Sequence, residues 1–132
     1  MNKNTKITLK ALLEKKEQIL NSKKTRKTAE LYVKSLDGTI TVVAPNRAII
    51  TDSAEMGGDD GTMGDVYIVY QCVTEPALKS KELQDAFECI EPMEIVEKLF
   101  LPGEINAIAK ELFELAGYDQ NGVRKVTDDV KN

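Results

Sequence analysis

The sequence contains no histidine and no tryptophan, and its 132 residues include only two cysteines. Without histidine it lacks the usual nucleophile–histidine pair, the commonest metal ligand and the usual pH switch. Cys72 and Cys89 have no Cys-x-x-Cys spacing for zinc and are too few for a disulfide framework. Apolar residues flank both cysteines, so we predict two buried free thiols. We expect no catalytic residue, no cofactor and no bound metal.

Long apolar runs are also missing. No segment approaches the ~18 apolar residues that would cross a bilayer. The first residues lead into charged sequence rather than into the apolar core of a signal peptide. We therefore expect a cytoplasmic protein with no membrane partner.

The charge is divided unevenly along the chain. Residues 1–34 contain ten Lys or Arg and three Glu, a net charge of +7, whereas residues 35–132 contain eight Lys or Arg and nineteen Asp or Glu, a net charge of −11. The basic segment is most simply a solvated helix face attracted to the acidic part of the chain. It contains one aromatic residue and no arginine-rich stacking motif, so we do not expect nucleic-acid binding.

The first half predicts a helix, a hairpin and a second helix. Apolar residues recur at helical spacing over 8–21. Residues 29–44 alternate between apolar and polar on both sides of Asp37-Gly38, a dipeptide that suits the positive φ angles of a tight turn, so we predict one β-hairpin there. Asn46 is a suitable N-cap for a short helix through Ala54.

Residues 57–64 contain four glycines and predict a flexible connector. The segment lacks the Lys-Ser/Thr of a phosphate loop and the alternating acids of a calcium loop. Residues 66–73 are ambiguous, because β-branched and aromatic residues favour a strand whereas the sequence that follows is helical. We predict a helix from that context.

Short helices dominate the rest of the chain. The segment 65–118 contains a Ser80 N-cap for a helix to about Phe87, and Pro92 and Pro102 suit first helical turns. Gly117 is placed to end the last helix. The polar residues of 119–132 predict a flexible tail. The whole chain is expected to be a single α+β domain of mostly short helices with one hairpin.

Five short motifs between residues 76 and 118 resemble a known family. In order, they are Pro76-Ala77-Leu78-Lys79, Glu82-Leu83-Gln84-Asp85-Ala86-Phe87, Pro92-Met93-Glu94-Ile95-Val96, Leu99-Phe100-Leu101-Pro102-Gly103-Glu104-Ile105 and Glu114-Leu115-Ala116-Gly117-Tyr118. This order resembles the XkdN-like tail assembly chaperones of Gram-positive contractile-tailed phages, defective prophages and phage-tail-like bacteriocins. The Gly-rich 57–64 segment is not part of that resemblance.

The resemblance implies a non-enzymatic protein that binds the long helical tape measure protein and keeps it soluble while the tail tube polymerises. Such a protein is absent from the mature tail. Contact with the tail tube protein and self-association are further expectations, and a structural tail component or a small DNA-binding regulator are the alternatives. The candidate interaction residues are Leu99, Phe100, Leu101, Pro102, Gly103 and Glu104. Three bulky apolar residues in a row cannot all face one core, which favours exposed contacts by Leu99, Phe100 and Leu101; the alternative is that all three are core residues at a corner between two helices. Glu104 suits the dipole of a helix N-terminus better than it suits partner recognition.

Overall fold

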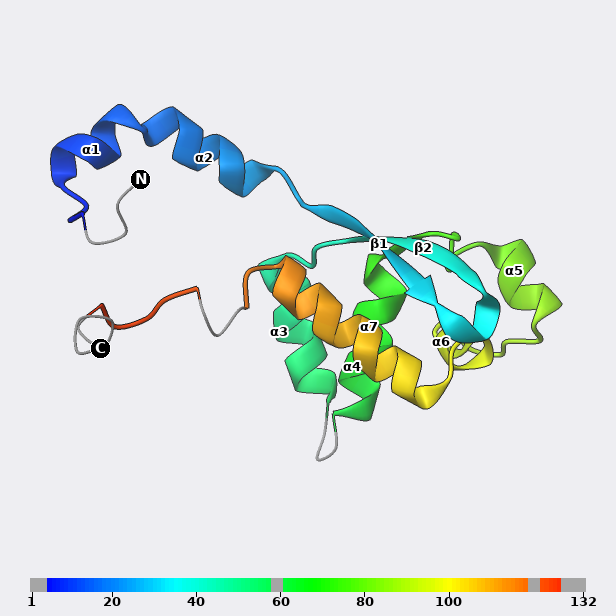
Figure 1. Cartoon of the computed structure of the whole chain (residues 1–132). Coiled ribbons are helices and arrows are strands. Elements are labelled where there is room, and N and C mark those ends of the chain that lie inside the picture. The colour runs from blue at the N-terminus through cyan, green and yellow to red at the C-terminus, as the bar shows by residue number, and fades with distance from the viewer. Residues whose placement is uncertain (1–4, 58–60, 119–121, 127–132) are drawn as a thin grey trace. The chain divides into compact units, whose positions relative to one another are not determined.

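The computed structural model describes residues 5–57, 61–118 and 122–126. The chain forms two compact units: Met1–Arg26 with Gln120–Asn132, and Lys27–Asp119 (Figure 1). We call residues 5–26 the arm and Lys27–Asp119 the body. In the second segment of the first unit, residues 122–126 are exposed and form neither helix nor strand. The other residues of the predicted tail at 119–132 lie outside the described ranges.

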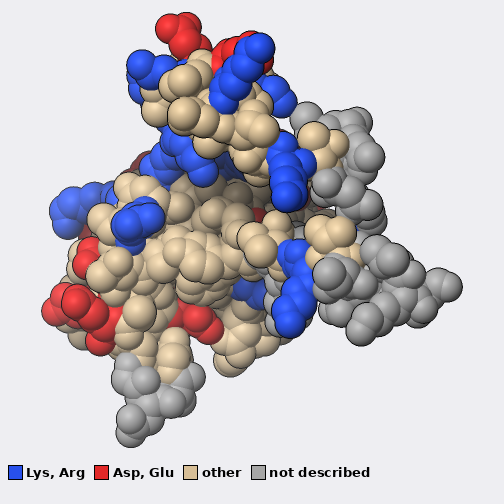
Figure 2. Space-filling model, turned by 90° about the vertical axis from the view of Figure 1, so that its left-hand side faces the viewer, with Lys and Arg blue, Asp and Glu red and all other residues tan. Residues whose placement is uncertain are grey.

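The arm consists of α1 (Leu9–Glu14) and α2 (Lys16–Lys24). The Thr8 hydroxyl caps α1 by accepting a hydrogen bond from the Ala11 N–H at 3.2 Å. The prediction of one helix over 8–21 was wrong in its bounds, because the helix is interrupted at Lys15 and continues to Lys24. Five polar residues separate Leu13 from Ile19, so the helical spacing of apolar residues is broken around the interruption. Figure 2 shows Lys and Arg side chains bordering uncharged surface on the arm.

The predicted hairpin is confirmed. β1 (Thr28–Val33) pairs antiparallel with β2 (Gly38–Val43), in register from Thr28 opposite Val43 to Val33 opposite Gly38. Its turn is longer than a two-residue Asp-Gly turn: η1 (Lys34–Leu36) comes first, and only Asp37 takes the left-handed conformation, at φ 50°. The Tyr32 hydroxyl donates to the Asp37 carboxylate at 2.8 Å, which supports this conformation.

A third strand, β3 (Val73–Glu75), completes a sheet of order β1-β2-β3 and was not predicted. It pairs antiparallel with β2, Val73 lying opposite Val42. The strand follows α4 (Thr62–Cys72) without a connecting loop. The helix predicted over 66–73 is therefore confirmed up to Cys72, whereas Val73 already belongs to the sheet.

The connector between α3 (Arg47–Met56) and α4 is shorter than the predicted Gly-rich segment of residues 57–64. α3 begins after the Asn46 cap, whose side chain accepts from the Ile49 N–H at 2.9 Å, as predicted. Gly61, at φ 75°, precedes the first residue of α4, so residues 62–64 are helical rather than looped. Residues 58–60 lie outside the described chain. Asp65 lies within the first turn of α4 and does not cap it.

Gly64 allows α3 and α4 to approach closely. The buried Ser53 hydroxyl donates to the Gly64 carbonyl at 2.9 Å. A Cβ atom on Gly64 would overlap the Ser53 carbonyl oxygen and would lie 3.3 Å from the Gly57 Cα. Glycine is needed here for space between two helices, not for a positive φ.

The remaining helices are α5 (Lys81–Ala86), α6 (Glu94–Leu99) and α7 (Pro102–Leu115). The Ser80 side chain caps α5 by accepting from the Leu83 N–H at 3.3 Å, and Gly117 takes φ 98° after α7, both as predicted. Pro102 is the first residue of α7, as its restricted φ favours. Pro92 does not start a helix, because α6 begins two residues later.

The core of the body lies where the sheet, α4, α6 and α7 meet, and the α+β class is confirmed. Its largest fully buried side chains are Ile68, Leu78, Ile95 and Leu112, joined by valines from strands and helices. Cys72 is buried as predicted, but Cys89 is only half-buried because it follows the end of α5. Neither Cys72 nor Cys89 forms a disulfide.

Candidate protein-binding surface

The predicted interaction segment, residues 99–104, forms the corner between α6 and α7. Its three bulky apolar residues point to different environments. Leu99 is half-buried against the core, Phe100 is only 3% exposed, and Leu101 is 58% exposed. The expectation that Phe100 offers an exposed contact is therefore wrong, because its ring completes the core where α6 ends. Leu101 is the member of the three that solvent or a partner can reach.

Glu104 connects this corner to the hairpin. One carboxylate oxygen accepts from the Leu101 N–H at 3.0 Å and from the Ser35 hydroxyl at 2.7 Å. The other accepts from the Ser35 N–H at 3.0 Å. The Leu101 N–H lowers the pKa of Glu104 most, and the Ser35 hydroxyl and N–H lower it further. Glu104 is thus a positioning residue that holds α7 against the turn of the hairpin.

Glu94 has a similar role at the start of α6. Its carboxylate accepts from the Ile90 N–H at 3.2 Å and from the Glu91 N–H at 3.0 Å. These bonds lower the pKa of Glu94, the Glu91 N–H having the larger effect. Each of the two helices that meet at the corner therefore has a glutamate in its first turn, and the carboxylate accepts from backbone N–H groups that lie outside the helix.

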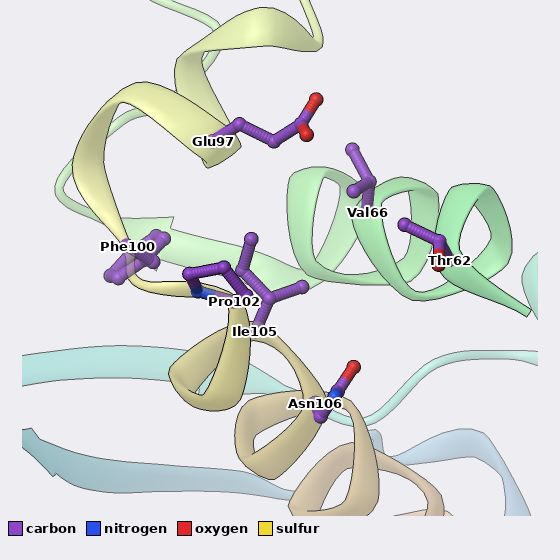
Figure 3. A pocket seen from close by; sticks show the side chains of 7 residues that line it. All are labelled: Thr62, Val66, Glu97, Phe100, Pro102, Ile105 and Asn106. Carbon is purple, nitrogen blue, oxygen red and sulfur yellow. The ribbon is translucent and has the colours of Figure 1, made fainter.

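A pocket of about 290 Å³ opens between α4, α6 and α7 (Figure 3). The residues that line it are Thr62, Val66, Glu97, Phe100, Pro102, Ile105 and Asn106. Apolar groups form most of its wall, with a hydroxyl, a carboxylate and an amide among them. In Figure 3, Glu97 on α6 and Val66 on α4 extend toward each other across the pocket, and Asn106 projects from α7 below it.

The pocket suits an apolar side chain of a protein partner. Apolar walls with a few polar groups are typical of sites that bind an anchor residue and orient its backbone. The described residues include no group of three or more His, Cys, Asp or Glu side chains that could hold a metal ion. Asp52 on α3 accepts a hydrogen bond from the Tyr67 hydroxyl at 3.2 Å, which joins α3 to α4.

Sequence reasoning located only part of this pocket. Phe100 and Pro102 belong to the predicted segment, and Leu101 lies between them in the chain. The remaining lining residues come from α4, α6 and α7 and were not predicted as site residues, since only the packing of these helices brings them together. Thr62 was assigned to the Gly-rich connector, and its helical position could not be read from the sequence pattern.

Comparison with solved structures supports the fold. The crystal structure of the protein YqbN matches with a TM-score of 0.57 and 17% identity, over 71% of this chain and 87% of that one. No curated protein matches the sequence. Within the described ranges, no helix is both long enough and apolar enough to cross a membrane.

The family comparison extends across nearly the entire chain. Residues 1–131 match the phage XkdN-like tail assembly chaperone proteins, including the arm and the Gly-rich segment outside the motifs of residues 76–118. The chain belongs to this family. Its role therefore lies in phage tail assembly, in a family of chaperones rather than of enzymes.

Proposed function

We propose that this protein binds the tape measure protein of its own phage or tail-like particle, keeps it soluble while the tail tube polymerises, and leaves before the tail is complete. It acts in the cytoplasm of the host cell. The tail assembly family supports the class of function. The pocket between α4, α6 and α7 is the observation that supports our choice of binding site. An elongated helical partner exposes apolar stripes, and such a pocket takes one anchor residue of a stripe.

Binding must be reversible, because tube subunits have to displace the chaperone. A dissociation constant in the micromolar range, about −8 kcal/mol per site, is sufficient. Several chaperone copies along one long partner would raise the overall affinity without any further contact. The net charge of −4 opposes aggregation of the complex.

Leu101 gives a direct test that separates binding from folding. It is the N-cap residue of α7, a position where Ser is preferred over Leu by about 1 kcal/mol. Leu101→Ser therefore removes an exposed apolar side chain beside the pocket without weakening the helix. We expect less tape measure protein in the soluble fraction of co-expressing cells, while the thermal stability of the chaperone stays equal or rises. Leu36→Ser, at a 49% exposed leucine in the hairpin turn, is the matched control.

Asn106→Arg places a long side chain at the pocket itself and tests the site independently. Ala107→Arg adds the same side chain at the next residue of α7, which is exposed and does not line the pocket. We expect only the first substitution to reduce co-purification with the tape measure protein. Equal solubility of the tape measure protein with and without the chaperone would contradict the proposal. Persistence of the protein in mature tails, detected by mass spectrometry, would favour a structural tail component instead.

A further inference from the structure

The apolar face of the arm has no partner within its own helices. No residue of α1 or α2 is buried, and the arm carries six large exposed apolar side chains. They are Ile7, Leu9, Leu12, Leu13, Ile19 and Leu20. Helices of 6 and 9 residues are too short to be stable alone in water, so a packed apolar face is what would stabilise them.

A cleft of about 260 Å³ lies on this face. Its apolar walls come from Ile7, Ala11, Leu12 and Ile19, and two lysines, Lys6 and Lys15, also line it. Residues 5–26 contain seven Lys or Arg and two Glu, a net charge of +5. The chemistry that fits the cleft is therefore an apolar side chain with carboxylates beside it.

The body offers such a surface on α5 and the turn that follows it. We call residues 82–91 the acidic corner: they contain four Asp or Glu and no Lys or Arg. Phe87 and Ile90 are exposed among these acids, Ile90 to 89%. Glu88 and Glu91 are exposed beside them. Asp85 has a cationic neighbour in Lys81, at 3.4 Å, but Lys81 lies outside the corner.

We propose that the arm of one copy binds the acidic corner of a second copy, so that the chaperone self-associates head to tail. Ile90 and Phe87 would contact the apolar face of the arm, while Glu88 and Glu91 would pair with its lysines. The opposite charges of the arm, +5, and of the corner, −4, argue for this pairing, and an arm that bound the corner of its own chain would leave the protein monomeric at every concentration. One arm and one corner per copy make the contact heterologous, which builds rings or open chains rather than only dimers.

The test uses the full-length protein and sedimentation velocity. We expect the mean mass to increase with protein concentration at about 50 mM salt and to fall toward the monomer at about 500 mM, because surface charge pairs are screened. Two charge-reversed proteins are compared: Lys6→Glu with Lys15→Glu in the arm, and Glu88→Lys with Glu91→Lys in the corner. Each should raise the dissociation constant by at least about tenfold. Glu111→Lys with Glu114→Lys, at exposed positions on α7, is the charge-matched control and should have no such effect.

Mixing distinguishes this contact from general charge effects and from misfolding. The arm-reversed and corner-reversed proteins should associate with each other, since each restores opposite charges to the other. Circular dichroism shows beforehand that both are folded. A wild-type protein that is monomeric at every concentration, a mixture that does not associate, or an equal effect of the α7 control pair would each overturn the proposal. None of these results depends on the tape measure protein.

Discussion

Replacing Gly64 by alanine should destabilise the body, even though alanine is the better helix former. The new methyl group would overlap the Ser53 carbonyl oxygen and would lie 3.2 Å from the Ser53 hydroxyl. The overlapping atom is backbone, so α3 has to move away from α4. Forced repacking of this kind costs about 1–3 kcal/mol. The displaced hydrogen bond from Ser53 to the Gly64 carbonyl costs about 1 kcal/mol more, which the helix propensity of alanine offsets by about 1 kcal/mol.

The expected net loss is about 1–3 kcal/mol, measured by urea unfolding followed by circular dichroism. With a slope of about 1 kcal/mol per molar urea, the midpoint should fall by about 1–3 M. Gly103→Ala is the matched control: Gly103 also lies in the first turn of a helix, but a Cβ atom there has no neighbour within 4 Å. We expect Gly103→Ala to be neutral or stabilising. If Gly64→Ala were as stable as Gly103→Ala, the close approach of α3 and α4 would be refuted.

Three further predictions concern the corner and the thiols. Phe100→Ala should lower the free energy of unfolding by about 3–5 kcal/mol in urea melts, because it leaves a cavity in the core, and a loss below about 1 kcal/mol would contradict the burial of the ring. Glu104 has a pKa below its ordinary value of 4.5, so its contribution to stability is present above pH 4.5 and is lost as the pH falls through the folded pKa. Glu104→Gln should therefore make stability less dependent on pH in this acidic range, measured by thermal melts between about pH 6 and pH 3. Iodoacetamide should label Cys89 in the native protein and Cys72 only after unfolding; rapid native labelling of Cys72 would show that its environment is open.

The elements that depend only on neighbouring residues could be predicted from the sequence. Asn46 and Ser80 cap helices because their side chains reach backbone N–H groups three residues on, and such reach is independent of the rest of the fold. The hairpin was predictable for the same reason, because alternating residues and Asp37 act over a short stretch of chain. These features follow from spacing alone.

Features that depend on packing could not be predicted in this way. β3 has only three residues and is a strand because β2 lies beside it. Phe100 stands in an apolar triplet whose sequence does not tell which member faces the core. The role of Gly64 depends on Ser53, which belongs to another helix. From the sequence alone, the four glycines of residues 57–64 therefore predicted a loop.

The contact between Ser35 and Glu104 joins residues that are 69 positions apart. Caps and turns in this chain can form within a few residues, but this contact requires the hairpin and α7 to be in place at once. The hydrogen exchange rate of the Ser35 amide therefore reports whether α7 has packed against the hairpin, and not merely whether the hairpin has formed. A fragment that ends before α7 would leave this amide without its acceptor.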